Sequence, residues 1–155
     1  MGENLLNRLK MTKQPPLREE VALNLAIAAS YFSGKIEKIL DEFGISGAQY
    51  NVLRILKGVY PEGHARCAIA MRMIERSPDI TRIIDRLEKQ GLVERIRTEE
   101  DRRMSITKIT GKGIEIVNKV NPLVSIEHAE STANLSDEEC KLLSELTEKL
   151  YKDMG

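Results

Sequence analysis

The chain contains no tryptophan, and its aromatic residues are only four tyrosines and two phenylalanines among 155 residues. A hydrophobic core must therefore be built from aliphatic side chains. The two cysteines, Cys67 and Cys140, are too few and too far apart in sequence for a disulfide framework. The longest nearly apolar stretch, residues 21–29, is much shorter than the roughly 20 residues that a membrane span needs. No secretory signal pattern is visible at the start, so we expect a cytoplasmic protein with no membrane partner.

The formal net charge of zero conceals an uneven distribution. Residues 54–113 carry 14 Lys+Arg and 9 Asp+Glu, which leaves 10 basic and 15 acidic residues for the rest of the chain. This segment also holds ten of the twelve arginines. The guanidinium fork of arginine suits phosphates and guanine edges better than the point charge of lysine does. The pattern favours an arginine-rich binding surface on an acidic scaffold, although a chance cluster on a solvated face stays open.

Apolar periodicity and capping residues divide the chain into helical segments. Residues 1–17 are polar and proline-containing, and we expect a flexible N-terminal arm. A long amphipathic helix is predicted over 18–43, ending at Gly44. Two further helices open at Thr110 and at Ser136, and Pro122 should kink or break the first of these. We expect 18–43 and 111–155 to form a helical dimerisation region around a central module, residues 44–110.

The central module has the order helix, helix, helix and β-hairpin. Ser46 and Gln49 have capping-box spacing and open a helix that ends before Gly58. A short helix follows at about 64–75, and Ser77-Pro78-Asp79 marks the start of the next one. Two β-branched-rich segments, 92–97 and 104–109, predict a hairpin with a charged tip. The predicted fold class is therefore mostly α: a winged helix-turn-helix with a two- or three-stranded β wing, plus helical dimerisation arms.

The helix after Ser77 has the pattern of a helix that lies in the major groove of DNA. Ile80, Ile84 and Leu87 share one face with Ile83, which leaves a polar face opposite. In a winged helix-turn-helix the first residues of that helix reach base edges, and a wing arginine can enter the narrow minor groove. The candidate DNA-binding residues are Ser77, Asp79, Thr81, Arg82, Asp85, Arg86, Arg97, Asp101, Arg102 and Arg103. An ordinary surface helix and a solvated turn of mixed charge remain the alternatives.

Three stretches in this segment resemble the MarR family of bacterial regulators. They are Asp85-Arg86-Leu87 continuing to Gly91-Leu92-Val93, then Asp101-Arg102-Arg103, then Ile106 to Gly113. The resemblance covers about residues 20–152. The sequence departs from the family pattern at Ile109, where leucine is usual, and in the segment 65–76.

The resemblance implies a homodimer that binds a palindromic operator on double-stranded DNA, as a repressor that releases DNA when it senses a small molecule. Two modules would face half-sites about 10 base pairs apart. By position, Arg103 would be the wing-tip arginine and Asp85 the carboxylate able to pair with it.

Other binding and catalytic sites have weaker support in the sequence. The resemblance implies a small aromatic or anionic effector, for which Tyr31, Tyr50 and Met71 are candidate contacts, although each is more typical of a core. His64, Cys67, His128 and Cys140 leave a metal- or redox-responsive regulator as an alternative, but their spacing suits zinc poorly and we expect both cysteines to be buried.

The sequence has no motif of a phosphate loop, a zinc protease or a serine hydrolase, so we expect neither an enzyme nor a cofactor. A winged module that binds a protein partner is the remaining alternative. Salt dependence would separate it from a DNA-binding one, because phosphate contacts weaken steeply with salt.

Overall fold

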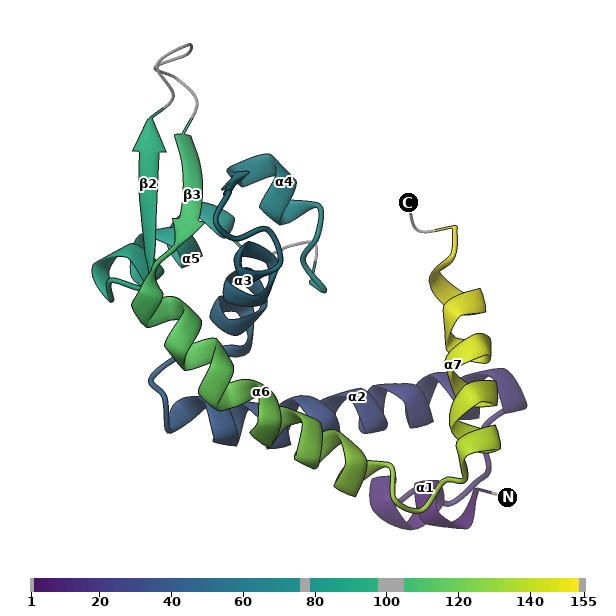
Figure 1. Ribbon diagram of the computed structural model, residues 1–155. Coiled ribbons are helices and arrows are strands. Elements are labelled where there is room, and N and C mark those ends of the chain that lie inside the picture. The colour runs from purple at the N-terminus through teal and green to yellow at the C-terminus, as the bar shows by residue number, and fades with distance from the viewer. Residues whose placement is uncertain (1, 76–78, 98–104, 154–155) are drawn as a thin grey trace.

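The computed structural model describes residues 2–75, 79–97 and 105–153, and it is shown in Figure 1. Seven helices and three strands are present in these residues. In chain order they are α1 (Glu3–Leu9), α2 (Leu17–Asp41), α3 (Gly47–Lys57), β1 (His64–Ala65), α4 (Arg66–Ala70), α5 (Ile80–Lys89), β2 (Val93–Arg97), β3 (Ser105–Ile109), α6 (Gly111–Ser131) and α7 (Asp137–Tyr151). The mostly helical fold with a small β wing confirms the predicted class.

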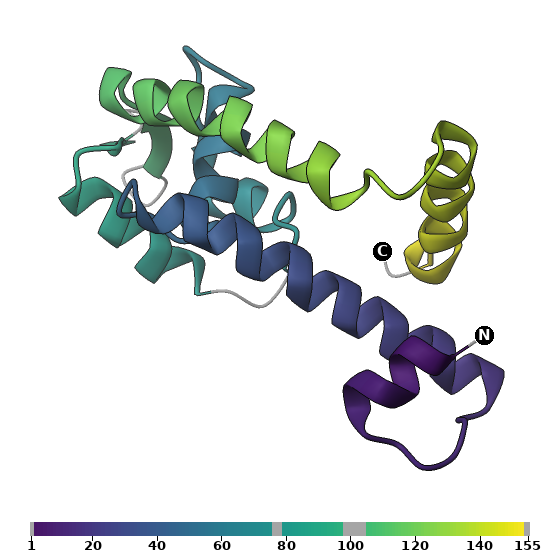
Figure 2. The same cartoon turned by 90° about the horizontal axis from the view of Figure 1, so that it is seen from below.

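Helices α2 and α6 pack along each other and form an arm (Figures 1 and 2). The winged module, which we define as α3, α4, α5 and the sheet, lies at one end of this arm, and α7 lies at the other. Pro122 lies inside α6, which continues to Ser131, so the predicted break does not occur. Pro122 is exposed, and water can therefore satisfy the carbonyl that loses its helical partner there.

The sheet has the strand order β1-β3-β2, with both pairs antiparallel. Strands β2 and β3 are the predicted hairpin, and Val93 pairs with Ile109 at its base. The short strand β1 differs from the sequence-based prediction: His64 and Ala65 were expected to begin a helix, but they pair with Thr107 and Ile106. The third predicted helix is consequently only the five residues of α4.

The core joins α3, α5, the sheet and the arm through aliphatic side chains, as the shortage of aromatic residues requires. Its fully buried members include Leu40, Leu53, Leu56, Ile69, Ile84, Leu87, Leu92, Val117 and Val120. Helix α5 enters this core with the predicted face, since Ile80, Ile84 and Leu87 are all buried. Burying one such side chain contributes about 1.5–3 kcal/mol, so this face fixes which side of α5 points outward.

Helix starts follow the predicted capping residues with one exception. Ser46 with Gln49 and Ser136 with Glu139 both form complete capping boxes. The cap of α5 is Asp79, whose carboxylate accepts a hydrogen bond from the Arg82 N–H. Ser77 and Pro78, the predicted start, lie outside the described residues.

The two ends of the chain differ in their packing. The segment expected to be a loose arm contains α1, which buries Leu5. By contrast, none of the fifteen residues of α7 is buried, and its apolar side chains Leu142, Leu143, Leu146, Leu150 and Tyr151 are all exposed. The chain therefore leaves the apolar face of α7 uncovered among the described residues. In the described part of the chain, no helix combines the length and the apolarity of a membrane span.

Candidate nucleic-acid interface

The outward face of α5 is polar and open to solvent. Asp79, Thr81, Arg82 and Arg86 are exposed, and Asp85 is half-buried. These residues lie opposite the buried isoleucines and Leu87, as the sequence predicts. Arg82 is in the first turn, where a helix that enters a major groove meets base edges. The geometry therefore presents one arginine at the tip of the helix and another, Arg86, one turn further along.

An ion-pair cluster connects α5 with the wing. The guanidinium group of Arg95, on β2, hydrogen-bonds the Asp85 carboxylate and lies 3.3 Å from the Glu88 carboxylate. The sequence-based prediction paired Asp85 with an arginine at the wing tip, whereas the described partner is Arg95. Arg95 thus bridges two carboxylates one turn apart and links the wing to α5. Arg95 pairs with Thr107 of β3 in the sheet, and the sequence did not show which helix the Arg95 side chain would meet.

A second connection joins α4 to the start of α5. Arg66 donates a hydrogen bond of 3.0 Å to the Thr81 hydroxyl. Both side chains line a cavity of about 410 Å³, which Cys67 and Arg95 also border. Cys67 is exposed and Cys140 is half-buried, so the expectation that both are buried is wrong. Arg66 was not among the predicted site residues, because nothing in the sequence places α4 beside Thr81.

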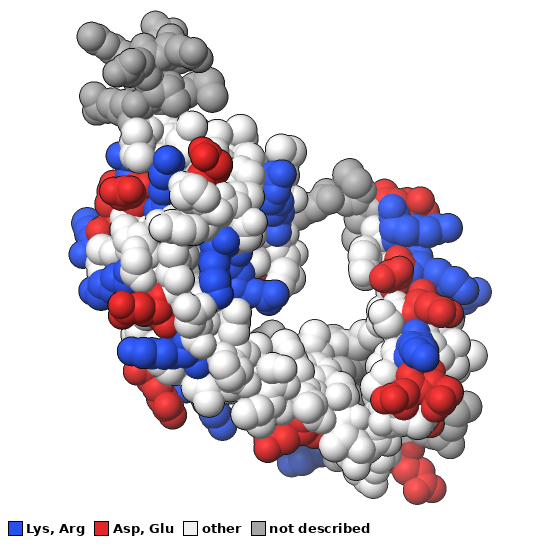
Figure 3. Space-filling model, in the orientation of Figure 1, with Lys and Arg blue, Asp and Glu red and all other residues white. Residues whose placement is uncertain are grey.

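Of the remaining predicted contacts, only Arg97 is among the described residues. Arg97 is the last residue of β2, whereas Asp101, Arg102 and Arg103 lie outside the described residues, like Ser77. On the face shown in Figure 3, Lys and Arg are interspersed with Asp and Glu over the winged module. The placement of individual arginines on α5, rather than a uniformly positive patch, is thus what distinguishes this surface.

A cavity of about 270 Å³ lies where the arm meets the winged module, and we call it the arm pocket. Its lining is contributed by α2, α3, α6 and the segment after α4: Phe32, Ser33, Ile36, Glu37, Gly47, Ala48, Tyr50, Asn51, Arg54, Met73, Ile74, Glu75, Val124 and His128. Of the three predicted effector contacts, Tyr50 belongs to this lining. Tyr31 and Met71 do not, and both are exposed.

The polar lining of the arm pocket also holds the module on the arm. The Glu37 carboxylate accepts a 2.9 Å hydrogen bond from the Gly47 N–H, at the positive end of α3. The Tyr50 hydroxyl donates a 2.6 Å hydrogen bond to Asn121 of α6. Burial raises the pKa of the Tyr50 phenol, and the nearby Arg54 acts in the opposite direction.

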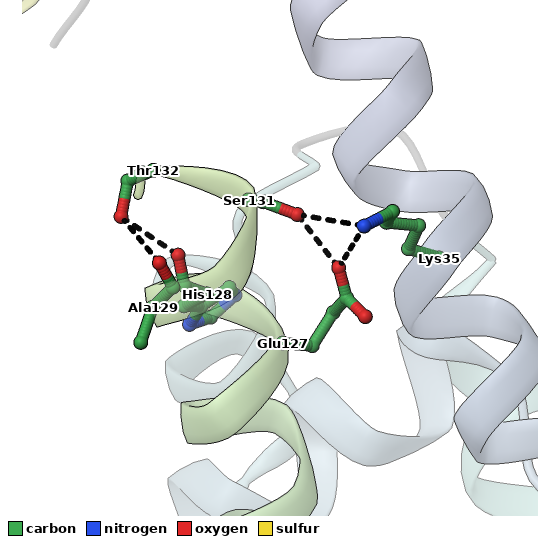
Figure 4. A network of polar contacts seen from close by, with 6 residues as sticks. All are labelled: Lys35, Glu127, His128, Ala129, Ser131 and Thr132. Atoms are coloured by element: carbon green, nitrogen blue, oxygen red, sulfur yellow. Dashed lines mark hydrogen bonds and ion pairs between the residues drawn. The ribbon is translucent and has the colours of Figure 1, made fainter. Parts of the chain in front are cut away.

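Charged groups also join the two helices of the arm, α2 and α6, as Figure 4 shows. The Lys35 ammonium on α2 lies 2.7 Å from the Glu127 carboxylate on α6 and donates a 3.3 Å hydrogen bond to Ser131. Ser131 in turn donates a 2.6 Å hydrogen bond to Glu127. The hydrogen bond from Lys35 is the main reason that the pKa of Glu127 is lowered, and the same bond raises the pKa of Lys35.

The four histidine and cysteine candidates are spread over four elements. His64 is in β1, Cys67 in α4, His128 in α6 and Cys140 in α7. Among residues 2–75, 79–97 and 105–153, no three His, Cys, Asp or Glu side chains gather in a group that could hold a metal ion. The structure therefore adds no support to the metal-responsive alternative.

Comparison with known proteins identifies relatives along most of the chain. A family model described as the MarR family matches residues 45–105. An uncharacterized HTH-type transcriptional regulator of Bacillus subtilis, YkoM, is 30% identical over 135 residues, which cover 84% of this chain and 86% of YkoM. The HTH-type transcriptional regulator PapX of Escherichia coli is 29% identical over 149 residues, covering 92% of this chain and 89% of PapX.

Solved structures agree with these sequence relatives. A MarR transcription factor from Planctomyces limnophilus is 35% identical with a TM-score of 0.69, and the match covers 88% of this chain and 98% of that one. Two structures below 25% identity share the fold. One is a Staphylococcus aureus MepR–DNA complex, with 20% identity and a TM-score of 0.77; the match covers 85% of this chain and 96% of MepR. The other is the organohalide-sensing regulator RdhR-CbdbA1625 bound to 2,4-dichlorophenol, with 18% identity and a TM-score of 0.82; the match covers 90% of this chain and 82% of that one. The chain belongs to the MarR family of transcriptional regulators.

Proposed function

We propose that the protein is a homodimeric, ligand-responsive repressor that binds a palindromic DNA operator and performs no catalysis. The observation that carries the proposal is the exposed face of α5, with Thr81, Arg82 and Arg86 directed to solvent and the wing locked beside it by Arg95. A helix held at a fixed angle to a wing suits simultaneous contact with the major and minor grooves. The MepR–DNA complex, whose protein shares this fold, supports binding to DNA.

The dimer is supported by the apolar surface that this chain leaves open. The exposed leucines of α7 repeat along one helix, and Leu17, Val21, Leu123 and Ile126 of the arm are also exposed; large exposed apolar surfaces mark interaction sites. A second copy of the chain would cover them symmetrically. Two winged modules would then present two α5 helices to successive major grooves, about one helical turn apart.

The arm pocket is the proposed effector site. Its volume of about 270 Å³ lies just below the range of roughly 300–1,000 Å³ that small-molecule sites span. Its lining combines Phe32, Ile36 and Val124 with the polar groups of Tyr50 and Arg54. RdhR-CbdbA1625, bound to 2,4-dichlorophenol, supports a small aromatic ligand for this fold. An arginine beside an apolar wall further suits a phenolate or a carboxylate.

A salt series tests the DNA-binding proposal. An operator is first selected from random-sequence DNA, and its dissociation constant is then measured between about 50 and 200 mM salt beside a scrambled duplex. We expect preferential binding that weakens steeply with salt, because phosphate contacts release counterions. Binding without sequence preference and with a shallow salt slope would instead indicate a protein partner.

Two arginines should carry a large share of the operator affinity. We expect Arg82→Ala and Arg103→Ala each to weaken operator binding by about 1–3 kcal/mol, the size of a good arginine contact. Arg18→Ala is the matched control, because Arg18 is exposed on α2, far from α5 along the chain. Affinities of the two variants that equal the control at the same salt concentration would contradict the assignment.

A further inference from the structure

Asn51 connects the arm pocket to the backbone that leads into α5. Its side chain lines the pocket, and its Oδ1 atom accepts a hydrogen bond of 2.9 Å from the N–H of Ile74. Asn51 belongs to α3, whereas Ile74 lies in the segment between α4 and α5. One side-chain amide thus touches both the cavity and this segment.

The hydrogen bond to Asn51 is made at Ile74, the first residue after α4 and Met73 whose side chain no longer packs in the core. Met73 is buried, and its N–H completes the turn after α4 by donating to the Ala70 carbonyl. The next side chain, Ile74, is 84% exposed. Burial of the Met73 side chain therefore anchors the backbone up to Met73. At Ile74, whose side chain is exposed, the backbone is anchored by the hydrogen bond to Asn51.

The position of Ile74 matters because α5 begins a few residues after it. Asp79, the N-cap of α5, is five positions further on, and Arg82 lies in the first turn. Glu37 and Tyr50 also carry polar groups into the arm pocket, but their partners are Gly47 and Asn121. Those two bonds hold α3 on the arm, whereas the Asn51 bond is directed toward the start of α5.

We propose that Asn51 is a positioning residue that couples the arm pocket to the DNA-facing end of α5. The inference rests on the proposed function and names the regulation of the same pocket. Without a ligand, the Asn51 amide holds the Ile74 N–H, five positions before the N-cap of α5. A ligand hydroxyl or carboxyl group that engages this amide competes with the Ile74 N–H for its oxygen or turns the amide away. Such a ligand favours the released segment and shifts the population away from the DNA-binding form.

Amide hydrogen exchange of the full-length ¹⁵N-labelled protein tests the hydrogen bond itself. Asn51→Ala removes the acceptor without introducing a helix breaker, because alanine is the best helix former. We expect the Ile74 N–H to exchange about two- to tenfold faster in this variant, the range that the loss of one net hydrogen bond gives. Asn51→Asp keeps an acceptor oxygen in the same place and should retain the protection of Ile74. Exchange at Ile74 that is equally fast in the wild type and in Asn51→Ala would overturn the proposal.

Operator binding tests the coupling, and removal of the acceptor reproduces the released state with no ligand present. We expect Asn51→Ala to weaken binding to the selected operator about two- to tenfold at fixed salt, by the same loss of one hydrogen bond. The control is Asn118→Ala, which removes the hydrogen bond from Lys57 on α3 to α6, away from the pocket lining. It should bind as the wild type does, and circular dichroism melts verify that both variants are folded.

The failures of the two proposals are distinguishable. A wild-type chain that selects no DNA sequence would overturn the proposed function and, with it, the coupling. A wild-type chain that binds its operator, together with an Asn51→Ala variant of unchanged affinity, would overturn the role of Asn51 alone. An equal loss of affinity in Asn51→Ala and Asn118→Ala would also overturn it, since the effect would then be a general one on α3.

Discussion

At the scale of single residues, close contacts explain why glycine occupies position 113, in the last of the three stretches that resemble the family. Gly113, near the start of α6, is buried, and a Cβ atom there would lie 2.3 Å from the Leu92 carbonyl oxygen. The side chain of Ile109 would also be too close, 2.7 Å from the same position. Any side chain at 113 would therefore separate α6 from the base of the wing. Gly111, two positions earlier, has nothing within 4 Å of its Cβ position.

These two glycines form a matched pair for mutagenesis. We expect Gly113→Ala to lower the free energy of unfolding by about 1–3 kcal/mol, the usual cost of overpacking. Gly111→Ala should change it by less than about 1 kcal/mol, because alanine is a better helix former and meets no neighbour there. Urea denaturation monitored by circular dichroism measures both. Equal stability of the two variants would show that the approach of Gly113 to Leu92 is not tight.

Residue-scale contacts also divide the roles of the arginines. Arg95 engages Asp85 and Glu88 and orients the wing, and Arg66 donates to Thr81. For the exposed Arg82, the backbone N–H is engaged by Asp79, and the side chain stays available for an external partner. The arginine-rich centre of the sequence thus contains arginines that bond within the chain as well as the exposed Arg82, which we propose contacts DNA, and composition alone does not separate the two kinds.

At the scale of elements, the contact between α2 and α6 depends partly on ionisation. The pKa of Glu127 is lowered, chiefly by its hydrogen bond with Lys35, and that of Lys35 is raised, chiefly by Glu127. A group with a lowered folded-state pKa stabilises the fold above its unfolded pKa and loses that contribution as the pH falls through the folded value. A raised lysine pKa acts in the opposite sense, at alkaline pH. The contribution of the Lys35–Glu127 ion pair to the free energy of unfolding should therefore be constant between about pH 5 and pH 10.

Replacement of Glu127 tests this pH dependence. We expect the wild type to be more stable than Glu127→Gln at pH 7, and the difference should shrink as the pH falls below about 4, the ordinary range of a glutamate pKa. Glu130→Gln is the control, because Glu130 is exposed on the same helix. Thermal melts over a pH series measure the difference. A gap between wild type and Glu127→Gln that widens on acidification would contradict the assignment.

At the scale of the whole molecule, the unburied helix α7 is the main indication of a partner. None of its residues is buried, although Leu142, Leu143, Leu146 and Leu150 repeat at helical spacing. Ser136 and Glu139 cap the helix, so its start is defined locally. The free energy that keeps such an isolated helix folded must come mainly from tertiary or quaternary packing.

Sedimentation velocity tests this prediction of a dimer. The wild type should sediment with twice the mass of the 17.5-kDa chain. Leu146→Glu places a charge on the apolar face of α7 and should shift the equilibrium toward monomer, because an unpaired buried charge is costly. Glu145→Gln, a neighbouring exposed position, should leave the mass unchanged. A monomeric wild type at micromolar concentration would count against the dimer.

Local patterns in the sequence were sufficient to predict most elements. The isoleucine stripe of α5, the capping boxes at Ser46 and Ser136, and the hairpin were all correctly expected, because periodicity and capping depend on residues a few positions apart. The strand β1 and the shortened α4 were missed, since pairing of His64 with Thr107 joins residues far apart in the sequence. Of the kink or break expected at Pro122, the break does not occur, and the exposure of Pro122 to solvent cannot be seen from its neighbours in the chain.

The sequence by itself determined the fold class and the outward face of α5, because both follow from short-range spacing, and its central motifs carried the resemblance to the MarR family. The tertiary structure decided which residues meet: Arg95 with Asp85, Glu37 with Gly47, and Asn51 with Ile74. It also placed Tyr50 in the arm pocket and left Tyr31 and Met71 outside the pocket lining. Contacts of this kind depend on how helices pack, and packing depends on the shape of the whole core.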